Sequence, residues 1–216
     1  MDVLAADLID ASEVRRVVEL IGKHGEIDLL IHAAGFATTA LFAESNVDRQ
    51  VQMVELHTVA AVRLSRAVVP EMIARGHGGV ILVSSFGSFA GTPGNATYSA
   101  TKAFLRVLAE ALHTELSHSG VRVQALCPGF TYTEFHDSPE FAGFDRSFIP
   151  RAFWMSADEV ATDSLRALER GQAVVVPGLK NRLLVAVSRN PLTVGVWRWA
   201  AERLRRRLQA RHRISA

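Results

Sequence analysis

The sequence has almost no cysteine and no long apolar run. Its one cysteine, Cys127, excludes a disulfide framework and a cysteine-based metal cage, and it is typical of a reducing compartment. No run of about 18 apolar residues occurs, so we expect no membrane-spanning helix. The first residues lack the basic region and apolar core of a signal peptide. These absences favour a soluble cytoplasmic protein.

Acidic residues are scarce only at the carboxyl end. The net charge of the 216 residues is +2, but residues 1–180 hold 15 Lys/Arg against 21 Asp/Glu. Residues 181–216 hold 9 Arg against the single acid Glu202. The body is therefore mildly acidic and the tail strongly basic. The chain is long enough to bury one α/β core. Its 49% of hydrophobic residues excludes a disordered protein.

Short apolar runs alternate with longer segments of helical period. Val3–Ala6 fits the end of a strand, and whole strands are predicted at Leu29–His32, Val80–Ser84, Val121–Leu126 and Gln172–Val176. Helices are predicted at about Ser12–Lys23, Asp48–Arg75, Tyr98–His118 and Asp158–Arg170, with an irregular stretch over 130–156. Ser12 is the expected N-cap of the first helix, Pro70 allows a kink or an early end, and Gly120 is well placed to end the third. Strands separated by helices predict a parallel sheet inside a three-layer α/β/α sandwich.

In such a sheet the ligand site lies beyond the carboxyl ends of the strands. Those ends deliver Asp7, Ala33-Ala34-Gly35, Ser84-Ser85 and Cys127-Pro128-Gly129. Two of these segments are turns of small residues, which let the backbone lie close to a flat or phosphorylated ligand. We expect the site at this edge.

Tyr98 and Lys102 form a candidate proton-transfer pair. They stand four residues apart on one helix, so both side chains project from the same face. An ammonium group nearby favours the phenolate and lowers the pKa of a tyrosine from about 10. The hydroxyl of Ser85, just past a strand end, is placed to orient or polarise a substrate oxygen. The alternative for the pair alone is a surface tyrosine beside a solvated lysine.

Together these segments resemble the short-chain dehydrogenase/reductase family from Val3 to about Gly178. The resemblance is carried by Ala6-Asp7-Leu8, His32-Ala33-Ala34-Gly35, Ser85, Tyr98-Ser99-Ala100-Thr101-Lys102 and Pro128-Gly129-Phe130-Thr131-Tyr132-Thr133. It implies a Rossmann-like fold for residues 1–178. It also implies an NAD(P)-dependent oxidoreductase that transfers hydride between the nicotinamide and a carbonyl or secondary alcohol.

The resemblance also implies roles for single residues. Ser85, Tyr98 and Lys102 would be catalytic, with Tyr98 exchanging a proton with the substrate oxygen and Lys102 also binding the nicotinamide ribose. The implied cofactor contacts are Asp7 and Leu8 near the adenine, Ala33, Ala34 and Gly35 at the adenine ribose, and Pro128, Gly129, Thr131 and Thr133 at the nicotinamide. No metal is implied, and the cofactor is NADP or NAD.

One part of the family pattern is missing from the sequence. The opening strand, the glycine-rich Thr-Gly-x-x-x-Gly-x-Gly turn, the helix and the second strand, about 50–60 residues, do not occur. The nearest pattern, Gly87-Ser88-Phe89-Ala90-Gly91, fits an active-site loop better than a phosphate turn. Leu29–His32 would then be an apolar edge strand, and the strand before Asp7 would have no sheet to join. We expect a misassigned start or a truncation. The alternative is a genuine short chain that has lost cofactor binding or exchanges strands with a partner.

Two histidines stand where the family often has asparagine. His57 lies in the long predicted helix, where the family asparagine completes a proton relay. A histidine there either continues the relay, with a titration near pH 6.5, or makes a structural bond. His32 fits a polar strand-end residue. Ala33-Ala34 replaces the more usual Asn-Ala, which loses one hydrogen bond and keeps the small turn.

Aromatic residues and arginines dominate two further segments. Over 130–156 the aromatics are Phe130, Tyr132, Phe135, Phe141, Phe144, Phe148, Phe153 and Trp154. They indicate a lid over an apolar substrate, or packing against the body or a partner subunit. Residues 179–216 form a basic extension in which Trp197, Ala201, Leu204 and Leu208 mark one helical stripe. The helix suits packing in a homo-oligomer, or a peripheral membrane contact through residues 191–213. No nucleic acid partner is expected.

The sequence leaves two functions open. The first is the NAD(P)-dependent oxidoreductase. The second is a non-catalytic binding or scaffold protein that has lost the pyrophosphate site. The intact set of Ser85, Tyr98 and Lys102 favours the enzyme.

Overall fold

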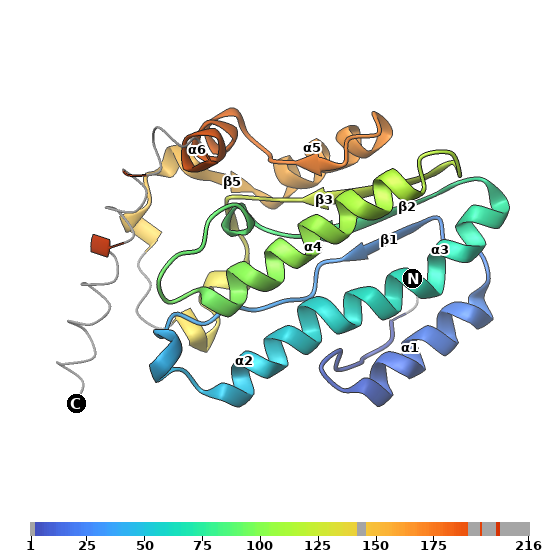
Figure 1. Ribbon diagram of the computed structural model, residues 1–216, viewed down its shortest axis with the longest axis horizontal. Helices are drawn as coiled ribbons and strands as arrows, with labels where there is room; N and C mark the ends of the chain where they lie inside the picture. The colour runs from blue at the N-terminus through green and yellow to red at the C-terminus, as the bar shows by residue number, and fades with distance from the viewer. Residues whose placement is uncertain (1–2, 142–145, 190–194, 196–201, 204–216) are drawn as a thin grey trace.

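The computed structural model describes residues 3–141, 146–189, 195 and 202–203, and its centre is a parallel β-sheet (Figure 1). Within these residues the sheet has four strands in the spatial order β1-β2-β3-β6. They are β1 (Leu29–His32), β2 (Gly78–Val83), β3 (Val121–Leu126) and β6 (Val174–Val175). A separate parallel pair, β4 (Phe130–Tyr132) and β5 (Trp154–Ser156), lies in the stretch expected to be irregular. The predicted parallel sheet is confirmed.

Helices alternate with the strands of the sheet, and a further helix follows the last strand. They are α1 (Ala11–His24), α2 (Val47–Val54), α3 (Ala60–Arg75), α4 (Ala96–Glu115), α5 (Ala157–Glu169) and α6 (Leu179–Arg189). In the described part of the chain, none of them is long and apolar enough to cross a membrane. The predicted helical stripe of Trp197, Ala201, Leu204 and Leu208 lies outside the described residues.

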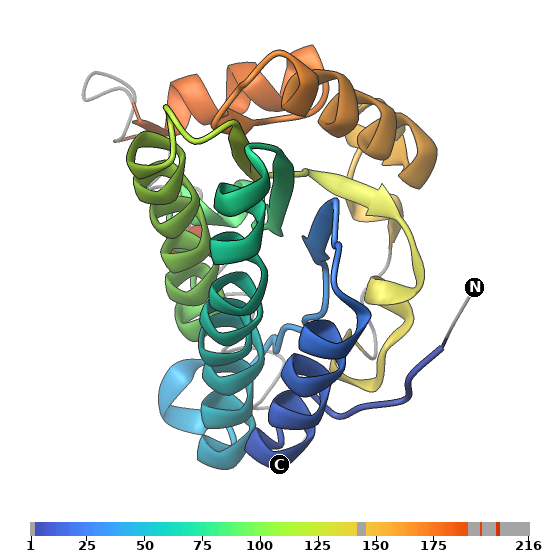
Figure 2. The same cartoon turned by 90° about the vertical axis from the view of Figure 1, so that its right-hand side faces the viewer.

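Side chains of β2 alternate between two helical layers. Val80 and Leu82 are buried against α3 and α4, whereas Ile81 is buried against Val160 and Ala167 of α5. The two views in Figures 1 and 2 show α1, α3 and α4 on one side of the sheet and α5 on the other. The predicted three-layer α/β/α sandwich is therefore confirmed.

Strand β1 is an open edge of the described sheet. It pairs with β2 through Leu29–His32, and among the described residues no strand pairs with its other side. Leu30 packs on the core, but Ile31 on the opposite face is 52% exposed. This is the apolar edge that the sequence predicts, with backbone groups that another strand could pair with.

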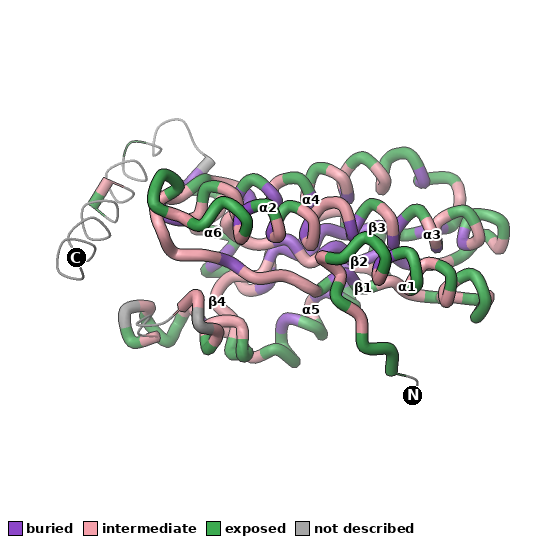
Figure 3. The backbone as a smooth tube through the Cα atoms, turned by 90° about the horizontal axis from the view of Figure 1, so that it is seen from below, coloured by how far each residue is buried: buried purple, intermediate pink, exposed green. Residues whose placement is uncertain are grey.

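The strand end predicted at Val3–Ala6 does not form. Residues 3–7 have no regular secondary structure, and most of this segment is exposed (Figure 3). A strand needs a hydrogen-bonded neighbour, and the described sheet ends at β1. As expected from the sequence, the segment before Asp7 has no sheet to join.

The long helix predicted over Asp48–Arg75 is interrupted. A π-helical turn over Glu55–Val59 separates α2 from α3, and the N–H of Ala60 bonds to the carbonyl of Glu55 five residues back. The extra residue in a π-turn rotates the side chains that precede it relative to those that follow. Pro70 neither ends nor interrupts α3, which continues to Arg75 and is capped by Gly76.

Two helix boundaries differ from prediction. Asp10, rather than Ser12, is the N-cap of α1, because its carboxylate accepts the N–H of Ser12 at 2.6 Å. Helix α4 ends at Glu115, before Gly120 is reached. Gly120 instead makes the turn into β3 with a φ of +79°.

Replacing Gly120 by alanine should destabilise the protein. A Cβ there would lie 1.9 Å from the carbonyl oxygen of Gly76, and the positive φ disfavours any side chain. We expect a loss of about 2–4 kcal/mol in the free energy of unfolding, measured in urea. As a control, Gly22→Ala in α1 meets no atom within 4 Å and should gain up to about 1 kcal/mol. Equal stabilities for the two variants would contradict this account.

Candidate active site

The loops that follow β1, β2 and β3 meet at one edge of the sheet, where the sequence predicts the ligand site. Residues 33–35 follow β1, residues 84–85 follow β2 and residues 127–129 follow β3. A 2.8 Å hydrogen bond from the N–H of Phe86 to the carbonyl of Pro128 ties the second loop to the third. The strands thus place three short segments of backbone side by side.

Ser85 and Tyr98 both lie next to Gly87. The Ser85 Oγ accepts a 3.0 Å hydrogen bond from the N–H of Gly87, at the start of a short 3₁₀ turn. A Cβ placed on Gly87 would lie 3.5 Å from Ser85 Oγ and 3.6 Å from Tyr98 Cε1. The structure therefore brings together the serine, from the loop after β2, and the tyrosine of α4.

Lys102 lies one turn beyond Tyr98 on α4 and is only 4% exposed. Its Nζ donates to the carbonyl of Val83 at 2.9 Å and lies 5.7 Å from the centre of the Tyr98 ring. The Ser84 hydroxyl donates to the Lys102 carbonyl at 2.7 Å, so α4 is bonded to the end of β2 in both directions. Burial lowers the pKa of Lys102 to about 8, because it penalises the charged ammonium.

The pKa of Tyr98 is raised above its ordinary value of about 10, so the prediction that Lys102 lowers this pKa is wrong. Burial is the largest cause, and it outweighs the opposite effect of the hydrogen bond with Ser85. The Lys102 ammonium is bonded to the Val83 carbonyl instead of the phenol oxygen. Tyr98 is therefore protonated at neutral pH, which is the form that donates a proton.

His57 is carried into this site by the π-helical turn and is fully buried. Its Nε2 accepts a 3.1 Å hydrogen bond from the N–H of Phe36, and its Nδ1 lies 2.8 Å from Thr101 Oγ1. Burial, followed by the charge of Lys102, lowers the pKa of His57 to about 2. Of the two alternatives for His57, this contradicts a relay that titrates near pH 6.5 and favours the structural bond. The contact with Thr101 was not predicted, although that residue stands in the Tyr98–Lys102 motif.

The predicted cofactor residues after β1 lie against the same cluster. Ala33 is exposed at the sheet edge, and Ala34 and Gly35 are half-buried. A Cβ on Gly35 would lie 2.6 Å from His57 Nε2 and 3.3 Å from Lys102 Nζ. His32, which ends β1, is 2% exposed, and burial lowers its pKa to about 4. Only glycine fits at position 35 without moving its neighbours.

The other predicted cofactor residues lie on two sides of this cluster. Pro128 and Gly129 leave β3, and Thr131 lies in β4, where its hydroxyl donates to the Gly129 carbonyl at 3.2 Å. Thr133 caps the next 3₁₀ turn. Asp7 and Leu8 precede α1. Asp7 is exposed and accepts the N–H of Ile9 at 3.0 Å, apart from the bonded group around Lys102.

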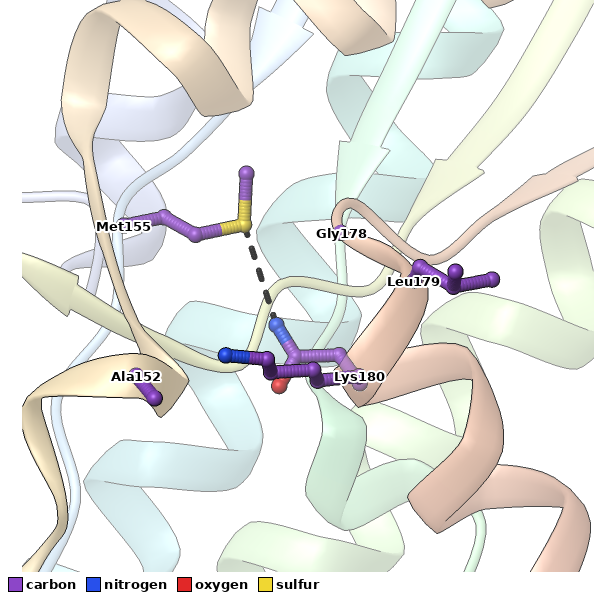
Figure 4. Close-up of a pocket in the computed structure, with 6 residues that line it drawn as sticks. Ala152, Met155, Gly178, Leu179 and Lys180 are labelled. Atoms are coloured by element: carbon purple, nitrogen blue, oxygen red, sulfur yellow. Dashed lines mark hydrogen bonds between the residues drawn. The ribbon is translucent and has the colours of Figure 1, made fainter.

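Asn181 of α6 was not predicted as a site residue. It is 4% exposed and donates to the Pro177 carbonyl at 3.0 Å, with Met155 Sδ at 3.7 Å. A Cβ on Gly129 would lie 2.7 Å from both amide atoms of Asn181, so the two residues touch. A pocket of about 260 Å³ opens here, lined by Ala152, Met155 and residues 178–181 (Figure 4). An isolated asparagine in an apolar and basic helix gave no signal for this contact.

Aromatic side chains of the 130–156 segment reach Tyr98. The Phe135 ring lies 6.2 Å from the Tyr98 ring and 5.3 Å from that of Phe141. Arg49 of α2 anchors the segment, since its Nε donates to Glu140 Oε1 at 3.0 Å. Of the aromatic residues singled out in the sequence, Phe144 lies outside the described residues.

Comparison with known proteins identifies the family of the chain. The sequence pattern of the family described as short chain dehydrogenase matches residues 1–140. The chain belongs to the short chain dehydrogenase family. The Rossmann-like α/β fold expected from the resemblance is therefore confirmed.

The relatives of this short chain dehydrogenase are longer than the chain. Oxidoreductase UcpA of Escherichia coli (strain K12) is 32% identical over 137 residues, which are 62% of this chain and 52% of the relative. A Sphingobium yanoikuyae short-chain dehydrogenase, solved in complex with NADPH, is 33% identical with a TM-score of 0.73, and the match covers 81% of this chain and 66% of that one. A bulky-bulky ketone specific alcohol dehydrogenase from Comamonas testosteroni is 28% identical with a TM-score of 0.70, covering 82% and 66%. The chain thus spans about half the length of the curated relative.

In this short chain dehydrogenase, Gly35→Ala should strain the site. The added Cβ would lie 2.6 Å from His57 Nε2 and 3.1 Å from His57 Cδ2, so the histidine must move. We expect a loss of about 1–3 kcal/mol in the free energy of unfolding, measured in urea. In the control variant Gly91→Ala, the Cβ meets no atom within 4 Å, and stability should change by less than about 0.5 kcal/mol. An unaltered stability for Gly35→Ala would show that position 35 has room to spare.

The pKa of Lys102 predicts how stability depends on pH. It is about 8 in the folded protein against 10.5 ordinarily, so between these values the unfolded chain binds more protons at this residue. Lys102 therefore lowers the free energy of unfolding below pH 8. This destabilisation is lost as the pH rises to 10.5. The difference in the free energy of unfolding between wild type and Lys102→Met should increase over this window. A difference that stays flat would mean that the pKa of Lys102 is not lowered.

Proposed function

We propose that the protein is an NAD(P)-dependent oxidoreductase that interconverts a carbonyl and a secondary alcohol. The observation that carries the proposal is the group formed by Ser85, Tyr98 and Lys102 at the carboxyl edge of the sheet. A bound nicotinamide dinucleotide supplies the hydride. Family membership supports this activity over a non-catalytic binding or scaffold protein.

The donors in this group suit a carbonyl oxygen and the hydroxyls of a ribose. Tyr98 keeps its proton at neutral pH and passes it to the substrate oxygen, or takes it back in the reverse direction. The Ser85 hydroxyl polarises the same oxygen. In the described structure Lys102 donates one of its three N–H bonds to Val83, which leaves two for ribose hydroxyls.

Two segments would hold the cofactor. Residues 33–35 on one side and Pro128, Gly129, Thr131 and Thr133 on the other would flank it, and Asp7 and Leu8 would lie toward its adenine end. The cofactor is NADP or NAD. The Sphingobium yanoikuyae relative in complex with NADPH supports a dinucleotide of this kind.

We propose an apolar and bulky substrate. Phe135 lies beside Tyr98, with Phe141 next to it, and the Comamonas testosteroni neighbour is specific for bulky-bulky ketones. Residues 1–178 would form the catalytic domain and residues 179–216 a basic helical extension that begins with α6.

The protein would act as a homo-oligomer in the cytoplasm. Exposed apolar side chains on α2, α3 and α4, among them Val51, Val62, Phe104 and Val107, support a subunit contact. The membrane contact considered for residues 191–213 lies outside the described residues, apart from Gly195, Glu202 and Arg203.

Tyr98→Phe should abolish turnover and leave cofactor binding intact. Without the phenol proton, reduction of aryl and cyclic ketones with NADPH or NADH should slow by about 10²–10⁴-fold, measured with the variant and the wild type both made as the full-length protein. NADPH binding, followed by nucleotide fluorescence, should match wild type. Tyr132→Phe, which removes the hydroxyl of the other tyrosine, should retain most of the turnover. Turnover by Tyr98→Phe at the wild-type rate would remove Tyr98 from this role.

A further inference from the structure

His57 connects two parts of the site that are far apart in the sequence. Its Nε2 reaches the N–H of Phe36, in the turn after β1, and its Nδ1 reaches the Thr101 hydroxyl on α4. Thr101 lies between Tyr98 and Lys102, and its hydroxyl also donates to the Tyr98 carbonyl at 2.9 Å. One buried side chain therefore bridges the proposed cofactor turn and the helix that carries the tyrosine and the lysine.

The positions of the hydrogens in this bridge follow from the partners. A backbone N–H can only donate, so the Nε2 that faces Phe36 must be unprotonated. A neutral histidine then carries its proton on Nδ1 and donates it to Thr101 Oγ1. The Thr101 hydroxyl, having accepted from His57, donates its own proton to the Tyr98 carbonyl. Each donor in this series of hydrogen bonds has one acceptor.

The surroundings of His57 oppose a second proton. Burial lowers its pKa most strongly, and Lys102 on α4 and His32 on β1 act in the same direction. The Phe36 ring, 6.1 Å away, and the Tyr98 ring, 6.0 Å away, carry no charge at neutral pH. A proton on Nε2 would face the Phe36 N–H and break the bridge.

We propose that His57 is a positioning residue that stays neutral, holds the Gly35–Phe36 turn against α4 through Thr101, and transfers no proton. This rests on the proposed function. The bridge sets the distance between the turn that would hold the cofactor and the side chains that would handle the proton. A change at either end of it alters the alignment of the reacting groups, which lowers the rate at saturating substrate.

The first test measures the histidine itself and needs no turnover. In protein labelled with ¹⁵N-histidine, the NMR signals lost in His57→Asn identify His57 among the eight histidines. They should show a protonated Nδ1 and an unprotonated Nε2, unchanged from about pH 5 to about pH 9. A proton on Nε2, or a titration within this range, would overturn the proposal.

The second test separates positioning from proton transfer. Thr101→Val removes the hydroxyl and should lower kcat about tenfold, with a smaller change in the KM for the ketone. Thr101→Ser keeps the hydroxyl and should restore most of kcat. Thr114→Val makes the same change further along α4, at an exposed residue whose hydroxyl bonds within the helix, and serves as the control.

The pH profile decides what role His57 itself has. His57→Leu, which can neither bond nor carry a proton, should lower kcat, while the limbs of the profile of kcat stay at the wild-type pH values. Loss of a limb in His57→Leu would make His57 a proton donor or acceptor and overturn the proposal. Failure of the wild-type protein to bind NADPH would contradict the proposed function, whereas the histidine signals would still test the bridge.

Discussion

The bond from the buried ammonium of Lys102 to the carbonyl of Val83 is the contact on which the site depends. The pairing of β1 with β2 ends at Leu82. The carbonyl of the next residue, Val83, can therefore accept a hydrogen bond from a side chain instead of from a strand. A buried charge needs such an acceptor, because desolvation without one costs several kcal/mol. The bond fixes α4 against the end of β2, and the first turns of α4 can then present Tyr98 beside Ser85.

Close packing around the ammonium explains why small residues surround it. Gly35 leaves no room for a Cβ between its backbone and His57, and Gly87 leaves Ser85 and Tyr98 side by side. His57 enters this space from the π-helical turn between α2 and α3. The local departure from α-helical geometry and the glycines therefore serve one arrangement, in which three segments of backbone approach a single buried lysine.

Much of the fold could be predicted because it depends on local patterns. Apolar runs bounded by glycine predicted β1, β2 and β3 within about two residues, and the spacing of Tyr98 and Lys102 placed both at the start of α4. The π-helical turn and the raised pKa of Tyr98 could not be predicted in this way. The π-helical turn has no sequence motif. The pKa of Tyr98 depends on burial, so a rule based on neighbouring charge gives the wrong sign once desolvation dominates. The contact between Gly129 and Asn181 depends on how α6 returns to the sheet, for which the sequence has no motif.

The described residues contain only part of the proposed chemistry. The proposed proton handling is contained in them, since Ser85, Tyr98 and Lys102 lie together between β2 and α4, with His57 of the π-helical turn bonded beside them. Phosphate binding has no counterpart there, because no glycine-rich turn opens a helix at this edge of the sheet. The open side of β1 and the exposed Ile31 lie on the same flank. The cluster that would move the proton is held by the hydrogen bonds of Lys102, Ser84 and His57, so its geometry can be tested by spectroscopy independently of cofactor affinity.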